Sequence, residues 1–221
     1  MEFIGDEAFR ECYHLKSISL PRSLKEIGNG VFEWCKILES IKIDINNPYY
    51  DSRDECNAVI ETNTNVLIAG CSGTRIPNSV VKIGENAFWG CDNMISIDIP
   101  NSVKEIGEQA FFKCEELKSV VMGTGVERIG VRAFEECTHL VSISMSTNLK
   151  EICDSSFHEC CSLVELNLPE SLTTIGDNAF ASCHALEKIV IPSGIKKLGS
   201  CVFAHCHLLE SLTILSKLVI I

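Results

Sequence analysis

The sequence has no long apolar run, no linker and no excess of positive charge. No apolar run approaches the ~20 residues of a membrane-spanning helix, and the first residues, MEFIGDEAF, lack the basic and apolar regions of a signal peptide. The 30 acidic residues outnumber the 19 lysines and arginines, which argues against nucleic acid and anionic membranes as partners. Because no proline-, glycine- or serine-rich stretch interrupts the chain, we expect a single domain over residues 1–221.

What the sequence has instead is an internal repeat of 23 residues. Its pattern is I-G-x-x-A-F-x-x-C-x-x-L-x-x-(I/V)-x-(L/I/M), and residues 106–122 carry it in full. The opening position recurs as Ile4, Ile27, Ile83, Ile106, Ile129, Ile152, Ile175 and Leu198. A period of about 20–29 residues with Leu and Ile at fixed offsets is typical of a leucine-rich-repeat solenoid. We therefore predict stacked coils that share one apolar interior.

Each coil should contribute one short strand to a parallel, concave sheet. The segment L-x-x-I-x-L, as in Leu15–Leu20, ends in an alternation of apolar and polar residues with period two. Its copies must pair in parallel, because each returns after one coil. Twenty-three residues leave no room for a long helix, so we expect short strands and 3-10 turns on the convex side. The repeat count predicts nine concave strands.

Two columns of the repeat should fill the core. The phenylalanine column contains Phe9, Phe32, Phe88, Phe111, Phe134, Phe157, Phe180 and Phe203. The cysteine column contains Cys12, Cys35, Cys91, Cys114, Cys137, Cys160, Cys183 and Cys206. Side chains in a column lie parallel and ~4.8 Å apart, whereas a disulfide needs them to face each other, so we predict buried free thiols. Cys56, Cys71, Cys153, Cys161 and Cys201 fall outside this column.

One turn, within residues 44–76, departs from the period. It places 33 residues instead of 23 between Ile43 and Ile76, after which the phase resumes. Two apolar runs, residues 58–60 and 66–68, flank Asn63-Thr64-Asn65 and predict a β-hairpin. We expect the hairpin to project from the convex side or an edge, because this turn should keep its concave strand.

The repeat I-G-x-x-A-F-x-x-C-x-x-L-x-x-I-x-L-P-x-S-L resembles the BspA-like, treponemal-type class of leucine-rich repeats. The irregular turn resembles a longer turn in such arrays of gut and oral bacteria. The resemblance covers essentially the whole chain and implies a cell-surface or secreted protein that attaches to host proteins, other bacteria or matrix. The chain opens within a repeat and ends in LTILSKLVII, where a polar cap is needed, so we expect a fragment of a longer array.

Polar columns on the predicted concave face suggest a binding surface. One column contains Ser17, Ser40, Gly73, Ser96, Ser119, Ser142, Glu165, Lys188 and Ser211. The next contains Ser19, Lys42, Arg75, Asp98, Val121, Ser144, Asn167, Val190 and Thr213. Charges cluster beside the irregular turn, which predicts a ligand footprint at Lys42, Arg75 and Asp98, flanked by Ser96, Ser119 and Ser142. The alternative is that small residues merely let the strands pack into a curved sheet.

A metal site can also be considered on the turn side. Cys161, His184 and His207 follow the column cysteine in three successive turns, and thiolate and imidazole suit Zn²⁺. Stacking would place them in a row rather than around a tetrahedron, and no C-x-x-C pair accompanies them. On the same side, Trp34, Trp89 and Phe112 are expected to be exposed.

The sequence argues against catalysis. It contains neither G-x-S-x-G nor a glycine-rich phosphate loop, and its six histidines fall in turn segments away from the concave serines. We therefore predict a non-catalytic, cofactor-free interaction or adhesion module that binds a protein or glycoprotein. The alternative is a structural spacer without a ligand, which the lack of concave aromatic residues favours. A zinc-dependent interaction module is the third hypothesis.

Overall fold

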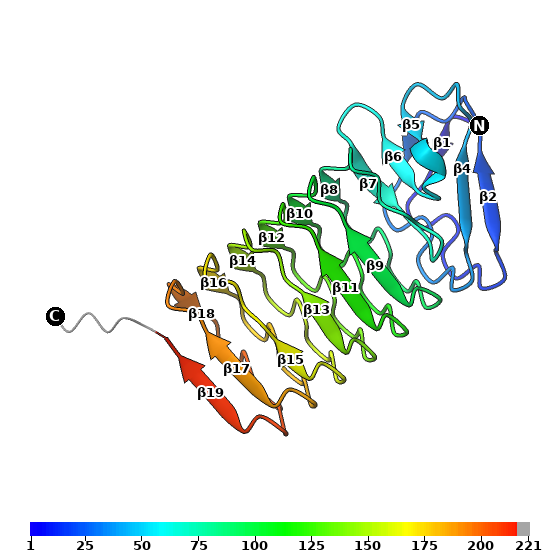
Figure 1. Cartoon of the computed structure of the whole chain (residues 1–221). Helices are drawn as coiled ribbons and strands as arrows, with labels where there is room; N and C mark the ends of the chain where they lie inside the picture. Colours follow the sequence, from blue (N-terminus) through cyan, green and yellow to red (C-terminus); the bar gives the residue numbers. More distant parts are fainter. Residues whose placement is uncertain (216–221) are drawn as a thin grey trace.

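The computed structural model describes residues 1–215 as a solenoid of nine stacked turns, without an α-helix in that range (Figure 1). The first residues and the last described strand lie at opposite ends of the stack. The predicted solenoid fold is confirmed.

Eight strands of two to four residues form the predicted concave sheet, which is parallel throughout. They are β2 (Ser17–Leu20), β4 (Ser40–Ile43), β9 (Ser96–Ile99), β11 (Ser119–Met122), β13 (Ser142–Ser144), β15 (Glu165–Leu166), β17 (Lys188–Ile191) and β19 (Ser211–Ile214). Equivalent residues pair one turn apart, as Ser119 does with Ser96 and Ser142. The sheet has three segments, β2-β4, β9-β11-β13 and β15-β17-β19. We call the exposed side of these strands, with the residue before each and with residues 72–76 between β4 and β9, the strand face.

The prediction of nine concave strands is wrong by one among residues 1–215. The third turn reaches the sheet through residues 72–76, which form no strand. Their backbone bonds go elsewhere, because the Ser72 N–H donates to Leu38 O at 3.1 Å and the Arg75 N–H donates to Cys56 O at 3.0 Å. The irregular turn therefore interrupts the sheet between β4 and β9.

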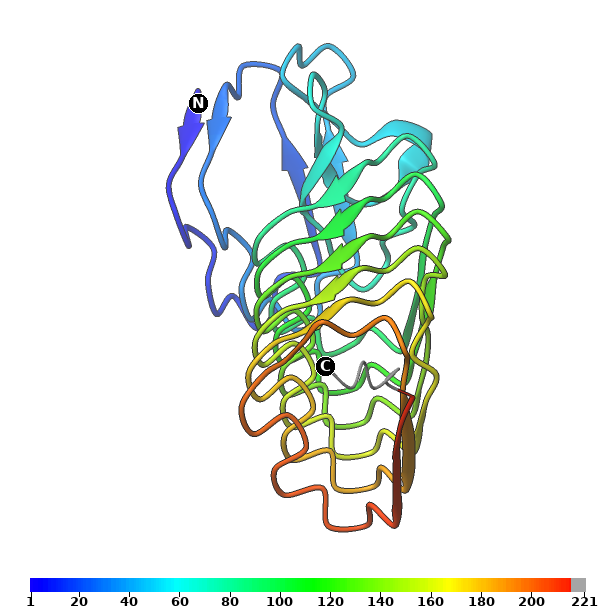
Figure 2. The ribbon, with the colours of Figure 1, turned by 90° about the vertical axis from the view of Figure 1, so that its left-hand side faces the viewer.

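A second sheet is built from strands of only two residues. They are β1 (Phe3–Ile4), β3 (Glu26–Ile27), β8 (Lys82–Ile83), β10 (Glu105–Ile106), β12 (Arg128–Ile129), β14 (Glu151–Ile152), β16 (Thr174–Ile175) and β18 (Lys197–Leu198). The first residue of each except β1 is polar and pairs across turns, so Glu105 lies 3.3 Å from Lys82 and 3.2 Å from Arg128. Strands β1 and β3 form a separate pair, displaced from the others in Figure 2.

The predicted hairpin exists but does not project. The irregular turn contains β5 (Tyr50–Asp51), the 3-10 helix η1 (Arg53–Glu55), β6 (Val59–Glu61) and β7 (Val66–Ala69). Strand β7 pairs in parallel with β8, with Leu67 beside Ile83, so the hairpin continues the second sheet. The expectation of a projecting hairpin is wrong, because both of its faces are apolar and both are covered.

The hairpin separates two apolar cores. Val59 and Ala69 pack with the first two turns, whereas Ile60 and Leu67 pack with the turns that follow. This division follows from the period of two along a strand, which sends neighbouring residues to opposite faces. The hairpin therefore lies inside the solenoid, between the two apolar cores, and contacts both.

The predicted phenylalanine column is confirmed, with one break. Phe88, Phe111, Phe134, Phe157, Phe180 and Phe203 stack with ring centroids 4.8–5.7 Å apart. Phe9 and Phe32 form their own pair at 5.7 Å. Gly70 lies at the break, where a Cβ atom would come within 2.0 Å of the Phe88 ring. A side chain at this position has no room.

The segments that carry Ala-Phe-x-x-Cys, here called the arms, are chains of turns rather than 3-10 helices. Each arm contains two residues with positive φ, such as Gln109 at 52° and Lys113 at 56°, which prevents a continuous helix. The N–H groups of one arm donate to carbonyls of the next, as from Phe111 to Ala133 at 2.7 Å. The Trp34 N–H donates to Trp89 O, so this ladder passes directly from the second turn to the fourth.

The cysteine column is buried and unpaired, as predicted, except at its ends, where Cys12 is exposed and Cys206 is half-buried. Six of its thiols donate to the phenylalanine carbonyl of the preceding turn, as Cys137 does to Phe111 O at 3.1 Å. Cys71, which falls outside the column, is buried as well, but its thiol donates to Asn57 O at 3.3 Å rather than to a phenylalanine carbonyl.

Burial predicts which thiols react. It raises the pKa of Cys114 to about 12 and that of Cys137 well above the usual range, so almost no thiolate forms at about pH 8. We expect iodoacetamide to modify the exposed Cys12 and Cys201 in the folded protein, and Cys114 and Cys137 only after denaturation. Peptide mass spectrometry of quenched samples measures this. Rapid labelling of Cys137 in the native protein would contradict the buried column.

Candidate functional site

A hollow in the strand face lies where the sheet is interrupted. It has a volume of about 520 Å³ and is lined by residues 72–76 of the third turn and 96–98 of β9. Arg75 and Asp98 are both exposed at its rim, and no ion pair joins them. The missing strand therefore leaves a polar recess with an accessible cation and anion.

Hydrogen bonds to the second turn and within the irregular turn fix the segment that carries Arg75. The Ser72 hydroxyl donates to Leu38 O at 2.9 Å, and the Thr74 hydroxyl donates to Asn57 O at 2.7 Å. Gly73 packs so closely that a Cβ atom would lie 2.2 Å from the carbonyl oxygen of Glu39. These contacts hold the backbone of the loop in place while the Arg75 side chain stays exposed.

The predicted site residues occupy three neighbouring parts of the strand face. Ser96 lines the hollow together with Arg75 and Asp98. Lys42 is exposed on β4, on the other side of the interruption. Ser119 and Ser142 pair across β11 and β13 and line a second hollow of about 510 Å³. The predicted residues therefore share one face, but no single recess holds them all.

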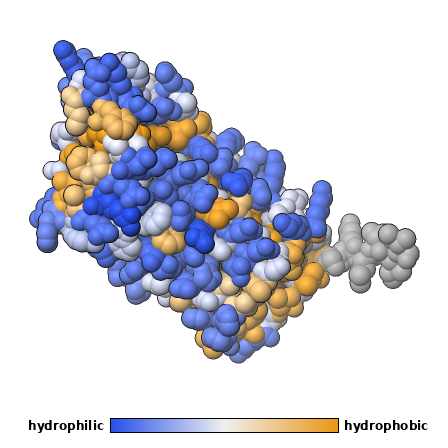
Figure 3. Space-filling view, turned by 180° about the vertical axis from the view of Figure 1, so that it is seen from behind, coloured by the Kyte–Doolittle hydropathy of each residue, from blue (hydrophilic) through white to orange (hydrophobic). Residues whose placement is uncertain are grey.

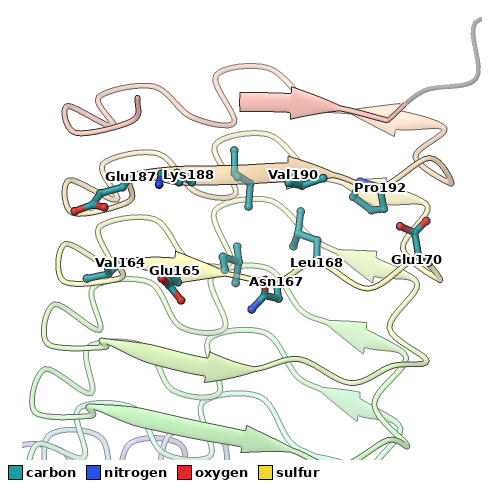
Figure 4. Close-up of a pocket in the computed structure, with 11 residues that line it drawn as sticks. Val164, Glu165, Asn167, Leu168, Glu170, Glu187, Lys188, Val190 and Pro192 are labelled. Atoms are coloured by element: carbon teal, nitrogen blue, oxygen red, sulfur yellow. The ribbon is translucent and has the colours of Figure 1, made fainter. Parts of the chain in front are cut away.

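A third hollow, which sequence reasoning missed, lies between the seventh and eighth turns. It has a volume of about 320 Å³ and includes Glu165, Asn167, Lys188 and Val190 (Figure 4). It opens because β15 ends at Leu166, so that Asn167 and the residue after it leave the ladder. The sequence gives no signal for this early end of β15 beyond Asn167 itself.

Charged side chains of the strand face take no part in ion pairs within residues 1–215. Ten such side chains are exposed, namely Lys16, Glu39, Lys42, Arg75, Asp98, Lys118, Glu165, Glu187, Lys188 and Glu210. Ion pairs occur instead on the arms, in the irregular turn and beside the short strands, as between Lys36 and Asp92 at 2.6 Å. The charges of the strand face are thus available to a partner.

The aromatic residues of the arms do not form the expected exposed patch. Phe112 is buried, Trp34 and Trp89 are half-buried, and the ring centroids of Trp89 and Phe112 lie 4.5 Å apart. The Lys36 and Lys113 ammonium groups lie 5.0 Å and 5.7 Å from the Trp34 ring. These contacts join the second, fourth and fifth turns. The side of the molecule opposite the strand face is mainly hydrophilic, with apolar patches towards both ends of the stack (Figure 3).

The three metal candidates do not converge. The rings of His184 and His207 stack with centroids 5.2 Å apart, and Cys161 belongs to the preceding turn. Among residues 1–215, no group of three or more His, Cys, Asp or Glu side chains is arranged to hold a metal ion. The zinc hypothesis therefore gains no support from the geometry.

Comparison with known protein families and solved structures identifies the family of the chain. The family model described as BspA type leucine-rich repeat region matches in six copies, over residues 1–59, 70–187 and 134–221. The chain belongs to this BspA-type leucine-rich repeat family. A search of curated proteins found no significant match. Within residues 1–215, no helix has the length and apolar character that a membrane span requires.

Solved structures of bacterial leucine-rich repeat proteins are similar to this BspA-type chain. A leucine-rich cell surface protein of Faecalibacterium prausnitzii A2-165 is 30% identical over 98% of the chain, with a TM-score of 0.72. The leucine-rich repeat protein of T. pallidum is 33% identical over 59% of the chain, with a TM-score of 0.56. A leucine-rich repeat protein of Bacteroides ovatus ATCC 8483 is 28% identical over 98%, with a TM-score of 0.67. The chain spans 52%, 62% and 59% of these three proteins, respectively.

Proposed function

We propose that this BspA-type solenoid is a non-catalytic interaction module that binds a protein or glycoprotein through its strand face. The contacts centre on Lys42, Arg75 and Asp98, with Ser96, Ser119 and Ser142 beside them. The observation that carries the proposal is that, among residues 1–215, the charges of this face are exposed and take no part in ion pairs, although ion pairs are frequent elsewhere on the solenoid. A net charge of −11 argues against nucleic acid as the partner.

The proposal includes a location at the cell surface or outside the cell. The relative from F. prausnitzii is described as a cell surface protein. Attachment to host proteins, other bacteria or matrix is the role that this kinship suggests.

A spacer role is the second candidate. It is favoured by the composition of the strand face, which carries no Trp, Tyr or Phe, the aromatic residues that dominate interface energies. A spacer would tolerate any change of exposed charge on that face. An interaction module would not.

A peptide selection separates the two candidates. We expect a random peptide library on phage, selected on the wild-type chain, to yield peptides that bind K42E/R75E roughly tenfold more weakly, because two attractions become repulsions. The control K196E/K197E makes the same change of charge at exposed residues in and beside β18. Equal binding to both variants would favour the spacer.

A further inference from the structure

The unpaired charges of the strand face are ordered along the solenoid axis. We number the turns from 1 to 9 in chain order. Turns 1 to 3 present three cations and one anion, and turns 7 to 9 present three anions and one cation. The cations are Lys16, Lys42 and Arg75 at the first end, and the anions are Glu165, Glu187 and Glu210 at the other. The positive end stands out because the whole chain has a net charge of −11.

The middle of the strand face presents exposed aliphatic side chains among its serines. Ile95, Val121 and Val141, from turns 4 to 6, are each exposed by 49–51%. The only charged residues there are Asp98 and Lys118, which are of opposite sign. The hollow beside β11 and β13 opens in this region and includes Val121.

We infer that the strand face binds an extended polypeptide segment with a defined order of charge, lying along the solenoid axis across the strands. Its acidic end contacts turns 1 to 3, its aliphatic side chains contact turns 4 to 6, and its basic end contacts turns 7 to 9. This inference rests on the proposed function and specifies the chemistry of its partner.

The dimensions fix the length of that segment. Lys42 in turn 2 and Glu187 in turn 8 are six turns apart, which corresponds to ~29 Å at ~4.8 Å per turn. An extended chain rises ~3.3 Å per residue, so about nine residues cover this span. The acidic and basic ends of the segment are therefore separated by about nine residues with apolar ones between.

A labelled synthetic peptide with aspartates at one end, valines in the middle and lysines at the other tests this order of charge. We expect it to bind the wild-type chain roughly tenfold more tightly than a peptide of equal composition with alternating charges, measured by fluorescence anisotropy. The variant K42E/R75E should prefer a peptide with lysines at both ends. The variant E165K/E187K should prefer one with aspartates at both ends.

The exchange of preference is decisive because a misfolded variant would lose all three peptides rather than change its choice. Added salt should weaken each matched pair, since the charges are exposed. Equal affinity for ordered and alternating peptides, or unchanged preferences in both variants, would overturn the inference. If selected library peptides still need Lys42 and Arg75 but show no order of charge, the proposed function stands and only this inference fails.

Discussion

Replacing Phe134 with alanine is expected to lower the free energy of unfolding by about 3–5 kcal/mol, as truncation of buried aromatic residues does. Phe134 is 0% exposed, and its ring stacks on Phe111 at 4.9 Å and on Phe157 at 5.2 Å. Removal of the ring leaves a cavity that neighbouring phenylalanines cannot fill, because each is held by its own turn. Urea denaturation measures the loss.

The matched control is Phe3→Ala, in which the same side chain is removed from a position that is 58% exposed. We expect this variant to differ little from the wild type. Because each turn contacts only its neighbours, amide exchange in Phe134→Ala should rise first in the arms of the two adjacent turns. A midpoint shift equal to that of Phe3→Ala would show that the column is not the core.

Replacing Ile60 with alanine is expected to cost about 2–5 kcal/mol, because Ile60 is completely buried in the larger core. Its neighbour Val59 is equally buried but faces the core of the first two turns. We therefore expect Ile60→Ala to increase amide exchange mainly in β8 and β10, and Val59→Ala to increase it mainly in β2 and β4. Hydrogen–deuterium exchange with mass spectrometry resolves these regions.

Ile45→Ala is the control for both substitutions, because Ile45 belongs to the same irregular turn but is 96% exposed. It should leave the exchange of both halves unchanged. If Ile60→Ala and Val59→Ala affect the same strands equally, the hairpin does not divide two cores.

The regular part of the fold follows from the sequence because each turn repeats its neighbour's environment. Once Phe111 and Phe134 occupy equivalent positions, translation by one turn places them in contact, and the same holds for Cys114 and Cys137. The hydrogen bonds from six of the column thiols to phenylalanine carbonyls could not be predicted, since they depend on the path of the arm.

The irregular turn could not be predicted in the same way, because its contacts are not repeated. Two apolar runs around Asn63–Asn65 correctly predicted a hairpin. Because its strands are apolar on both faces, the sequence did not indicate which face packs against which part of the solenoid. The third concave strand was predicted from Ile76, which matches the repeat. The backbone N–H groups of Ser72 and Arg75 instead donate to Leu38 O and Cys56 O. A repeating sequence pattern cannot predict these hydrogen bonds, because they occur in this turn alone.

The candidate site was partly predictable for the same reason. Column positions placed Lys42, Arg75 and Asp98 on one face, and the structure puts Arg75 and Asp98 at one hollow. That their charges stay unpaired depends on side-chain distances, which a column position does not give. The order of charge from Lys42 to Glu187 indicates a partner only because the structure shows these side chains to be exposed and outside any ion pair of residues 1–215.

The central claim is that the strand face binds a polypeptide, and the affinity of selected peptides for two charge-reversed variants tests it most directly. Our account predicts roughly tenfold weaker binding to K42E/R75E and unchanged binding to K196E/K197E. Equal affinities for the two variants, or loss only in K196E/K197E, would contradict it.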